Sequence, residues 1–133
     1  MNDLCKARLE KALDDLKTAK DNANLENYRL VMNRSYYVIF HAIRAVNSLD
    51  GFDSKKHSGV IAHFRQNYIK TGRISDKNSD IIEELQMIRN ASDYDDFYIV
   101  SKDDAIEQMN NAEIFLNEIK DFLKKDEQSN RPM

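Results

Sequence analysis

Residues that interrupt helices are scarce in this chain. Its 133 residues include three glycines and one proline, and apolar residues recur every three or four positions through most of the sequence. Because glycine and proline are the residues least compatible with a helix interior, long helices are expected. Gly51, Gly59 and Gly72 stand apart from one another, which excludes a glycine-rich phosphate-binding loop. The sequence therefore predicts an all-α protein.

The apolar periodicity predicts five helical segments. They span about residues 3–20, 25–49 and 57–70, with a fourth beginning near 75 and a fifth from about 101 to 125. Residues 21–24 supply cap-type side chains that are expected to end the first helix. Ser101 and Asp104 match a capping pattern at the start of the last. The end of the fourth is left open, because residues 93–100 fit either a frayed helix or an extended connection.

Short connections between long helices favour antiparallel neighbours. The predicted architecture is an up-and-down antiparallel bundle of four main helices plus a shorter helix. Residues 1–125 are expected to form this single domain, and the polar residues 126–133 are predicted to be a disordered tail.

Composition excludes several classes of protein. Lys and Arg total 20 against 23 Asp and Glu, so a strongly basic nucleic-acid-binding protein is excluded, although a local basic patch is not. The lone Cys5 excludes an internal disulfide and a cysteine-based zinc site. The first residues lack the apolar region of a signal peptide, and no apolar run reaches the roughly 18 residues of a membrane span. A cytoplasmic protein with no membrane partner is expected.

The segment 25–49 is apolar nearly all round between Tyr36 and Val46. A helix of this kind is either central to its bundle or covered by another subunit. A chain of this size would have difficulty covering it, so a homodimer is expected.

Polar side chains also follow one face of this segment. They are Arg34, Tyr37, His41 and Arg44, spaced by three, four and three residues. Such a stripe meets a partner helix, a ligand or water. Hydrogen-bonded core or interface residues are the more common explanation, and ligand binding is the alternative.

A second cluster precedes the 57–70 segment. Lys55, Lys56 and His57 stand at a helix start, where free backbone N–H groups could help to hold a phosphate or a carboxylate. A helix cap with solvated lysines is the more common arrangement. No histidine pair has the spacing of a metal site, so no metal is predicted.

The third cluster lies at the end of the fourth segment. Arg89 and Asp93 are four residues apart, which fits an intrahelical ion pair. Alternatively, Arg89 and Asn90 project from a helix end and grip a phosphodiester, with Tyr94 and Tyr98 nearby. The sequence favours neither interpretation.

Together these three clusters resemble a known family. The runs are Ser35–Ala45 (S-Y-Y-x-x-F-H-A-x-R-A), Lys55–Gly59 followed by Phe64, and Arg89 with Asp93 and Tyr94. Their order and spacing are similar to those of HEPN-domain (higher eukaryotes and prokaryotes nucleotide-binding) proteins, in particular a small stand-alone prokaryotic branch. The resemblance implies an up-and-down helical bundle that usually dimerises through its long helices.

The resemblance also implies a function. Many relatives are metal-independent ribonucleases that act as toxins or defence effectors, with the motif R-x(4–6)-H in a dimeric cleft. Arg89 and Asn90 match its start, but the histidine positions hold Tyr94, Asp95 and Asp96. RNA or nucleotide binding is therefore expected, while cleavage loses its usual base. Asp93, Tyr94 or His41 would have to replace it.

The alternative is a non-catalytic module that pairs with a minimal nucleotidyltransferase, because relatives are often encoded beside one. In some such pairs a tyrosine after the arginine motif accepts the nucleotide, and Tyr98 or Tyr94 would be that residue here. No cofactor is implied by either hypothesis.

Overall fold

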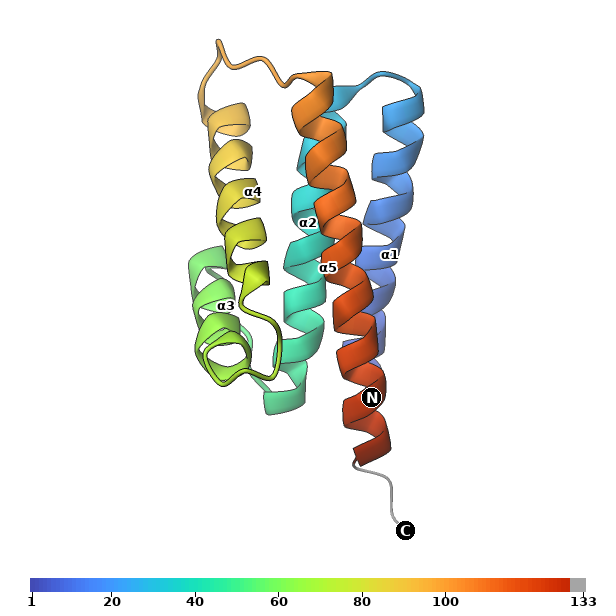
Figure 1. Ribbon diagram of the computed structural model, residues 1–133, viewed down its shortest axis with the longest axis vertical. Coiled ribbons are helices and arrows are strands. Elements are labelled where there is room, and N and C mark those ends of the chain that lie inside the picture. Colours follow the sequence, from blue (N-terminus) through green and yellow to red (C-terminus); the bar gives the residue numbers. More distant parts are fainter. Residues whose placement is uncertain (130–133) are drawn as a thin grey trace.

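A computed structural model describes residues 1–129, and they form an antiparallel helical bundle (Figure 1). The elements in chain order are α1 (Asp3–Asn24), α2 (Tyr28–Asn47), the 3₁₀ turn η1 (Ser48–Asp50), α3 (His57–Phe64), the π-helical turn η2 (Arg65–Ile69), α4 (Lys77–Tyr94) and α5 (Lys102–Ser129). The long helices α1, α2, α4 and α5 run alternately up and down, and α3 packs beside α2. There is no strand among these residues, so the predicted all-α architecture is confirmed.

Helix α2 is the centre of the bundle. It packs against α1, α3, α4 and α5 within the same chain. Its buried apolar side chains are Val31, Met32, Tyr36, Val38, Ile39, Phe40, Ala42, Ile43, Ala45 and Val46. The all-round apolar character of α2 is thus explained by burial inside one chain, and the homodimer stays a prediction.

Aromatic side chains join the short helix to the bundle. The Phe64 ring lies 5.9 Å from that of Phe115, and the Tyr68 ring lies 5.7 Å from that of Phe122. Phe64, Tyr68 and Phe115 have no exposed surface. Because burying a large apolar side chain contributes roughly 1.5–3 kcal/mol, these contacts hold α3 and η2 firmly against α5.

The first helix is longer than the sequence predicts. Residues 21–24 carry the side chains of a helix end, but α1 continues to Asn24. The cap-type side chains bond within the helix instead: Asn22 donates to the carbonyl of Thr18, and Asp21 pairs with Lys17 at 3.5 Å. The chain reverses only at Glu26, whose φ of 59° is left-handed.

The connection between α4 and α5 takes the extended alternative. Helix α4 ends at Tyr94, and Asp95 has an extended backbone whose carboxylate accepts the N–H of Phe97. Ser101 Oγ accepts the N–H of Asp104 at 3.1 Å, so the predicted cap of the last helix is confirmed.

The predicted tail needs a correction at its start. Helix α5 continues to Ser129, four residues past the predicted end of the domain at 125. Its last turn is held by Ser129 Oγ, which donates to the carbonyl of Lys125. Residues 130–133 of the predicted tail lie outside the described residues. Among residues 1–129, none of the helices combines the length and the apolarity that crossing a membrane requires.

Candidate functional site

A groove of about 520 Å³ lies between α2 and the loop that leads into α3. We call it the α2–α3 groove. Its lining residues are Tyr37, Phe40, His41, Arg44, Asp53, Ser54, Lys55 and His57. Five of the predicted site residues, from two separate sequence clusters, therefore line one surface: Tyr37, His41, Arg44, Lys55 and His57.

Aromatic stacking fixes the position of His57. Its ring lies 3.9 Å from the Phe40 ring at an interplanar angle of 28°. The Tyr36 hydroxyl is 3.0 Å from His57 Nδ1, so one ring nitrogen already has a hydrogen-bond partner. Burial, followed by the charges of Arg89 and Arg44, lowers the pKa of His57. A neutral imidazole is therefore favoured here.

The loop that lines the groove, residues 51–56, is held near its middle by Asp53. Its carboxylate accepts from Arg8 at 3.1 Å and from Arg44 at 3.0 Å. Arg8 is buried in α1 and also donates to the carbonyl of Arg44. The hydrogen bond from Arg44 leads the effects that lower the pKa of Asp53. Two guanidinium groups thus neutralise the one carboxylate in the groove.

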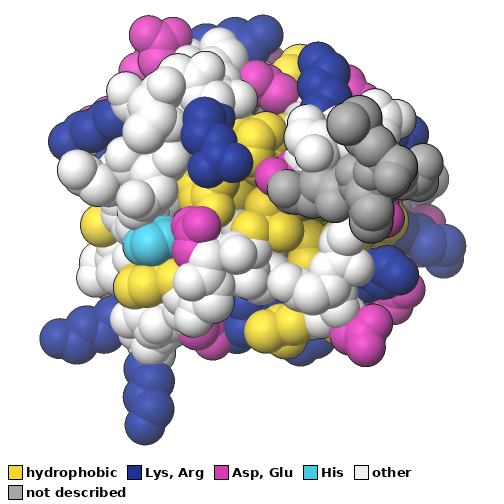
Figure 2. Space-filling model, turned by 90° about the horizontal axis from the view of Figure 1, so that it is seen from below, with side chains coloured by type: hydrophobic (Ala, Val, Ile, Leu, Met, Phe, Trp, Pro, Cys, Tyr) yellow, Lys and Arg dark blue, Asp and Glu magenta, His cyan; other side chains and the backbone are white. Residues whose placement is uncertain are grey.

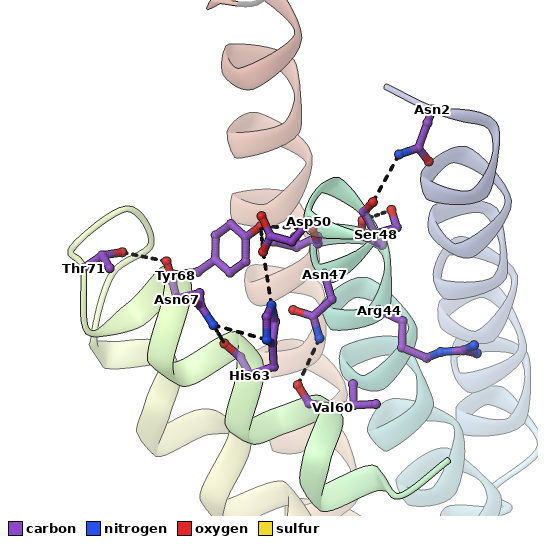
Figure 3. Close-up of polar contacts among 12 residues, drawn as sticks. Asn2, Arg44, Asn47, Ser48, Asp50, Val60, His63, Asn67, Tyr68 and Thr71 are labelled. Atoms are coloured by element: carbon purple, nitrogen blue, oxygen red, sulfur yellow. Dashed lines mark hydrogen bonds and ion pairs between the residues drawn. The ribbon is translucent and has the colours of Figure 1, made fainter. Parts of the chain in front are cut away.

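The start of the loop is held by a polar cluster (Figure 3). Asp50 Oδ2 accepts from the Tyr68 hydroxyl at 2.6 Å and lies 3.1 Å from His63 Nε2. Asn67 donates to His63 Nδ1, which makes Nε2 the protonated nitrogen when the ring is neutral. The Phe52 ring stacks on His63 at 3.9 Å. The loop is therefore anchored to α3 and η2 as well as to α1 and α2.

Gly59 allows the loop to lie close to α3. A Cβ at this position would be 2.7 Å from Ser54 Oγ and 3.2 Å from Ser54 Cβ. Ser54 Oγ also accepts the N–H of Lys56, which begins α3 as its cap residue. The Lys55–Gly59 motif thus has a steric reason, because a side chain at position 59 would have to displace the side chain of Ser54.

His41 is a neutral side chain at the edge of the groove. Burial, and then the charges of Arg44, Lys11 and Arg34, lower its pKa from 6.5 to about 4. Its Nε2 lies 3.6 Å from Asp15 Oδ2 on α1, and its buried Nδ1 has no hydrogen-bond partner. An imidazole with this pKa is unprotonated at neutral pH but is a weak base.

Arg89 packs against the aromatic side of α2. Its guanidinium carbon lies 4.7 Å from the centre of the Tyr36 ring and 5.9 Å from that of Tyr37. Its Nη2 is 3.5 Å from the Tyr37 hydroxyl. Its Nε lies 2.8 Å from Asp93 Oδ2 in a geometry that is an ion pair and not an aligned hydrogen bond. Tyr37, whose ring is 5.7 Å from that of His41, links Arg89 to the groove.

The remaining site candidates lie outside the groove. Asn90, Tyr94 and Lys56 are exposed. Tyr98 is half-buried, and its carbonyl accepts from Arg29 at 2.9 Å. Arg34 pairs with Asp15 at 3.0 Å and lies over the Tyr37 ring. The structure therefore brings Arg89 and Asp93 together as the intrahelical pair, and it does not place Asn90 or Tyr94 in the groove.

Sequence reasoning missed the residues that hold the groove together. Arg8 lies in α1, far from every motif, and Asp53 looks like an ordinary loop residue. The succession of Asp53 and Ser54 before a helix start was the one local signal. No group of three or more His, Cys, Asp or Glu side chains among residues 1–129 is arranged to hold a metal ion.

The fold and site define a class of protein: an all-α bundle whose central helix carries an aromatic and basic groove. Residues 5–122 match the model of the HEPN domain. The chain belongs to the HEPN-domain family, as its motifs implied.

Three relatives illustrate this membership. The Methanocaldococcus jannaschii protein "Putative toxin MJ0142" is 31% identical over 115 residues, 86% of this chain and 78% of the relative. "Putative toxin MJ0605" of the same organism is 31% identical over 118 residues, 89% of this chain and 87% of the relative. A "UPF0332 protein" of Thermotoga maritima is 27% identical over 117 residues, 88% of this chain and 86% of the relative.

Proposed function

We propose that this chain is a toxin-type HEPN protein that binds single-stranded RNA in the α2–α3 groove. The observation that carries the proposal is the charge of the groove. Arg44 and Lys55 supply cations, and the one carboxylate, Asp53, is shared between Arg44 and the buried Arg8. Two relatives whose names contain the word toxin support the toxin class.

The groove combines the two features that single-stranded RNA requires. Cations contact the phosphate backbone, and flat side chains offer surfaces on which bases stack. Tyr37 and His57 are half-buried, so each presents part of its ring to the groove. The exposed ammonium group of Lys55 stands beside them. We expect backbone contacts at Arg44 and Lys55 and base contacts with the exposed parts of the Tyr37 and His57 rings.

Cleavage is expected to be weak. The motif histidine is replaced by Tyr94, which is 78% exposed and away from the groove. His41 lines the groove, but its low pKa makes it a poor acceptor for a 2′-hydroxyl proton. The cation of the family motif, Arg89, is already paired with Asp93. Binding without efficient turnover is the activity that these residues support.

A second copy of the chain would enlarge this surface. The family resemblance implies a dimer, in which two grooves would face one shared cleft. We therefore expect RNA binding to depend on protein concentration in the range where the dimer forms. Sedimentation of the protein with and without RNA would measure this dependence.

The binding test changes Lys55, which lines the groove, together with its exposed neighbour Lys56. We expect Lys55→Gln with Lys56→Gln to weaken RNA binding about tenfold. The slope of the logarithm of the binding constant against the logarithm of the salt concentration should become shallower by about 0.7 for each phosphate that the variant no longer neutralises. Fluorescence anisotropy of a labelled RNA measures both. The matched control is Lys120→Gln with Lys124→Gln, the same charge change on α5. The proposal would be contradicted if both variants bound RNA equally weakly, or if both bound it as well as the parent.

A second candidate is a protein-interaction module that pairs with a minimal nucleotidyltransferase. The observation that favours it is the exposure of apolar side chains in the α4–α5 connection: Phe97 is 92% exposed and Ile99 is 86% exposed. Asp95 and Asp96 lie between them and α4. Such a segment suits a partner with a basic surface and an apolar pocket. Its exposed hydroxyl makes Tyr94 a better nucleotide acceptor than Tyr98.

The second candidate has its own test. Phe97→Ser with Ile99→Ser would abolish copurification with a co-expressed nucleotidyltransferase, while the RNA affinity of the chain stays unchanged. Mass spectrometry of the chain after incubation with that enzyme and ATP would show a nucleotide adduct, absent in Tyr94→Phe. An adduct that persists in Tyr94→Phe would shift the acceptor role to another residue.

A further inference from the structure

A second cavity, of about 500 Å³, lies between α4 and the α3–η2 segment. We call it the α3–α4 cavity. Its lining residues are Ser58, Ile61, Ala62, Arg65, Gln66, Lys70 and Gln86. Only Ser58 among them belongs to the sequence motifs described above, so the family resemblance implies no function for this cavity.

The polar groups of this cavity favour an anion. Arg65 and Lys70 are cations, and no carboxylate is among the lining residues. Neither of them forms an ion pair within residues 1–129. Arg65 donates from Nη2 to the carbonyl of Ser79 at 3.3 Å, and its buried Nε has no hydrogen-bond partner. The Lys70 ammonium therefore remains available in a cavity without a negative charge of its own, and Arg65 adds a second positive charge there.

Most of the other arginines among residues 1–129 pair with a carboxylate. Arg8, Arg34, Arg44 and Arg89 each pair with an aspartate. At the lower end of the bundle, basic and acidic side chains lie near one another around exposed apolar ones (Figure 2). A third cavity is lined by both signs of charge, including Arg73 and Glu118. The α3–α4 cavity alone among these three has cations without carboxylates.

A π-helical turn shapes the cavity wall. Along η2 the N–H of Lys70 bonds to the carbonyl of Arg65 at 2.9 Å, five residues back and not four. Such turns carry an extra residue and are frequent at functional sites. Here the wide turn has a cationic side chain at each end, and both side chains line the cavity. Gln66, whose amide oxygen is 3.5 Å from Lys70 Nζ, keeps its NH₂ group as a donor.

We propose that the α3–α4 cavity binds a second phosphate of the RNA strand whose first contact is in the α2–α3 groove. This inference rests on the proposed RNA binding. Ser58 of the cavity directly follows His57 of the groove, so the two sites flank the first turn of α3. A helix with its side chains is about 10–12 Å across. A short oligonucleotide therefore fills the groove alone, and a longer strand reaches both sites.

The experiment compares RNA lengths in three variants. Anisotropy is measured with labelled single-stranded RNA of about 4 and about 16 nucleotides, which bracket the usual site sizes of single-strand-binding domains. The variants are the cavity pair Arg65→Gln with Lys70→Gln, the groove pair Lys55→Gln with Lys56→Gln, and the α5 control pair Lys120→Gln with Lys124→Gln. Arg65 also donates a hydrogen bond to the Ser79 carbonyl, so its replacement could alter the fold. The single variant Lys70→Glu, at an exposed residue, is therefore measured as well.

The expected result separates the two sites. The cavity pair and Lys70→Glu should weaken the binding of long RNA about tenfold and leave the binding of short RNA unchanged. For long RNA, the slope of the logarithm of the binding constant against that of the salt concentration should become shallower by about 0.7 for each phosphate that is no longer neutralised. The groove pair should weaken the binding of both lengths. Long RNA that binds the cavity pair and Lys70→Glu as well as the parent overturns this inference and leaves the groove proposal intact. A parent that binds neither length overturns the proposed function and this inference with it.

Discussion

The guanidinium of Arg89 stacks on the ring of Tyr36, with 4.7 Å between the guanidinium carbon and the ring centre. The hydroxyl of the same tyrosine is 3.0 Å from His57 Nδ1. One side chain of α2 thus joins a residue of α4 to a residue of α3. The first residue of the family's arginine motif therefore has a packing role, besides any contact with RNA.

Replacing Arg89 should cost stability. Arg89→Ala removes the stacking on Tyr36 and leaves Asp93 without its partner, so we expect the free energy of unfolding to fall by about 2 kcal/mol. Arg89→Lys keeps the charge and loses the planar stack, so a smaller loss is expected. Urea unfolding measures both. An alanine variant as stable as the parent would show that the stack contributes nothing. RNA binding by Arg89 variants should be interpreted only after this measurement.

Restoring the motif histidine should create cleavage. Tyr94→His gives the spacing R-x4-H from Arg89, and Tyr94 is exposed, so the change should not disturb the core. We expect chelator-resistant RNA cleavage to rise about tenfold, below the range usual for a well-positioned general acid or base, because position 94 lies outside the α2–α3 groove. The rise should vanish in the double variant with Arg89→Ala. Unchanged cleavage in a folded Tyr94→His variant would show that more than the histidine is missing.

The buried His41 should make stability depend on pH. Its pKa is about 4 in the folded chain and near 6.5 when unfolded, so the unfolded state binds a proton first as the pH falls. Its contribution is complete above pH 6.5 and is lost progressively toward pH 4, by roughly 3 kcal/mol in total. His41→Gln removes this titration, so the stability difference between parent and variant should shrink over that range. Equal slopes in parent and variant would contradict the burial of a neutral ring.

Gly59→Ala should disturb the groove wall. The added Cβ would meet Ser54 Oγ at 2.7 Å, so we expect a loss of about 1–3 kcal/mol in unfolding free energy and weaker RNA binding. Ser54→Gly in the same chain removes both contacts and should restore most of the stability. If the double variant is no better than the single one, the cost of Gly59→Ala comes from elsewhere.

Much of the fold follows from the sequence because the helix signal is local. The stripe on α2 and the cap at Ser101 both depend on residues within a few positions of each other. The helix end predicted near residues 21–24 was wrong, and the reason is also local. Asp and Asn serve as caps only when a nearby N–H is free, and here Asn22 bonds to a carbonyl one turn back in its own helix.

The site was less accessible to sequence reasoning. The motif residues Tyr37, His41 and Lys55 could be named, but their meeting in one groove could not be predicted, because it depends on how α3 folds back on α2. Arg8 carries no local pattern that marks it as a groove residue. The α3–α4 cavity depends on a π-helical turn, which no spacing rule predicts.

The clamp on Asp53 ties the groove to a helix that contributes no side chain to its lining. Arg8 of α1 is 6% exposed, and it needs the Asp53 carboxylate as much as the loop does. The Arg8 side chain is buried while that of Asp53 is 45% exposed, so replacing Asp53 alone would leave a buried charge without its carboxylate and destabilise the chain. We therefore expect the residues at positions 8 and 53 to change together among related chains. A fusion that displaced α1 would separate Arg8 from Asp53, and the groove would lose RNA binding although none of its own lining residues had changed.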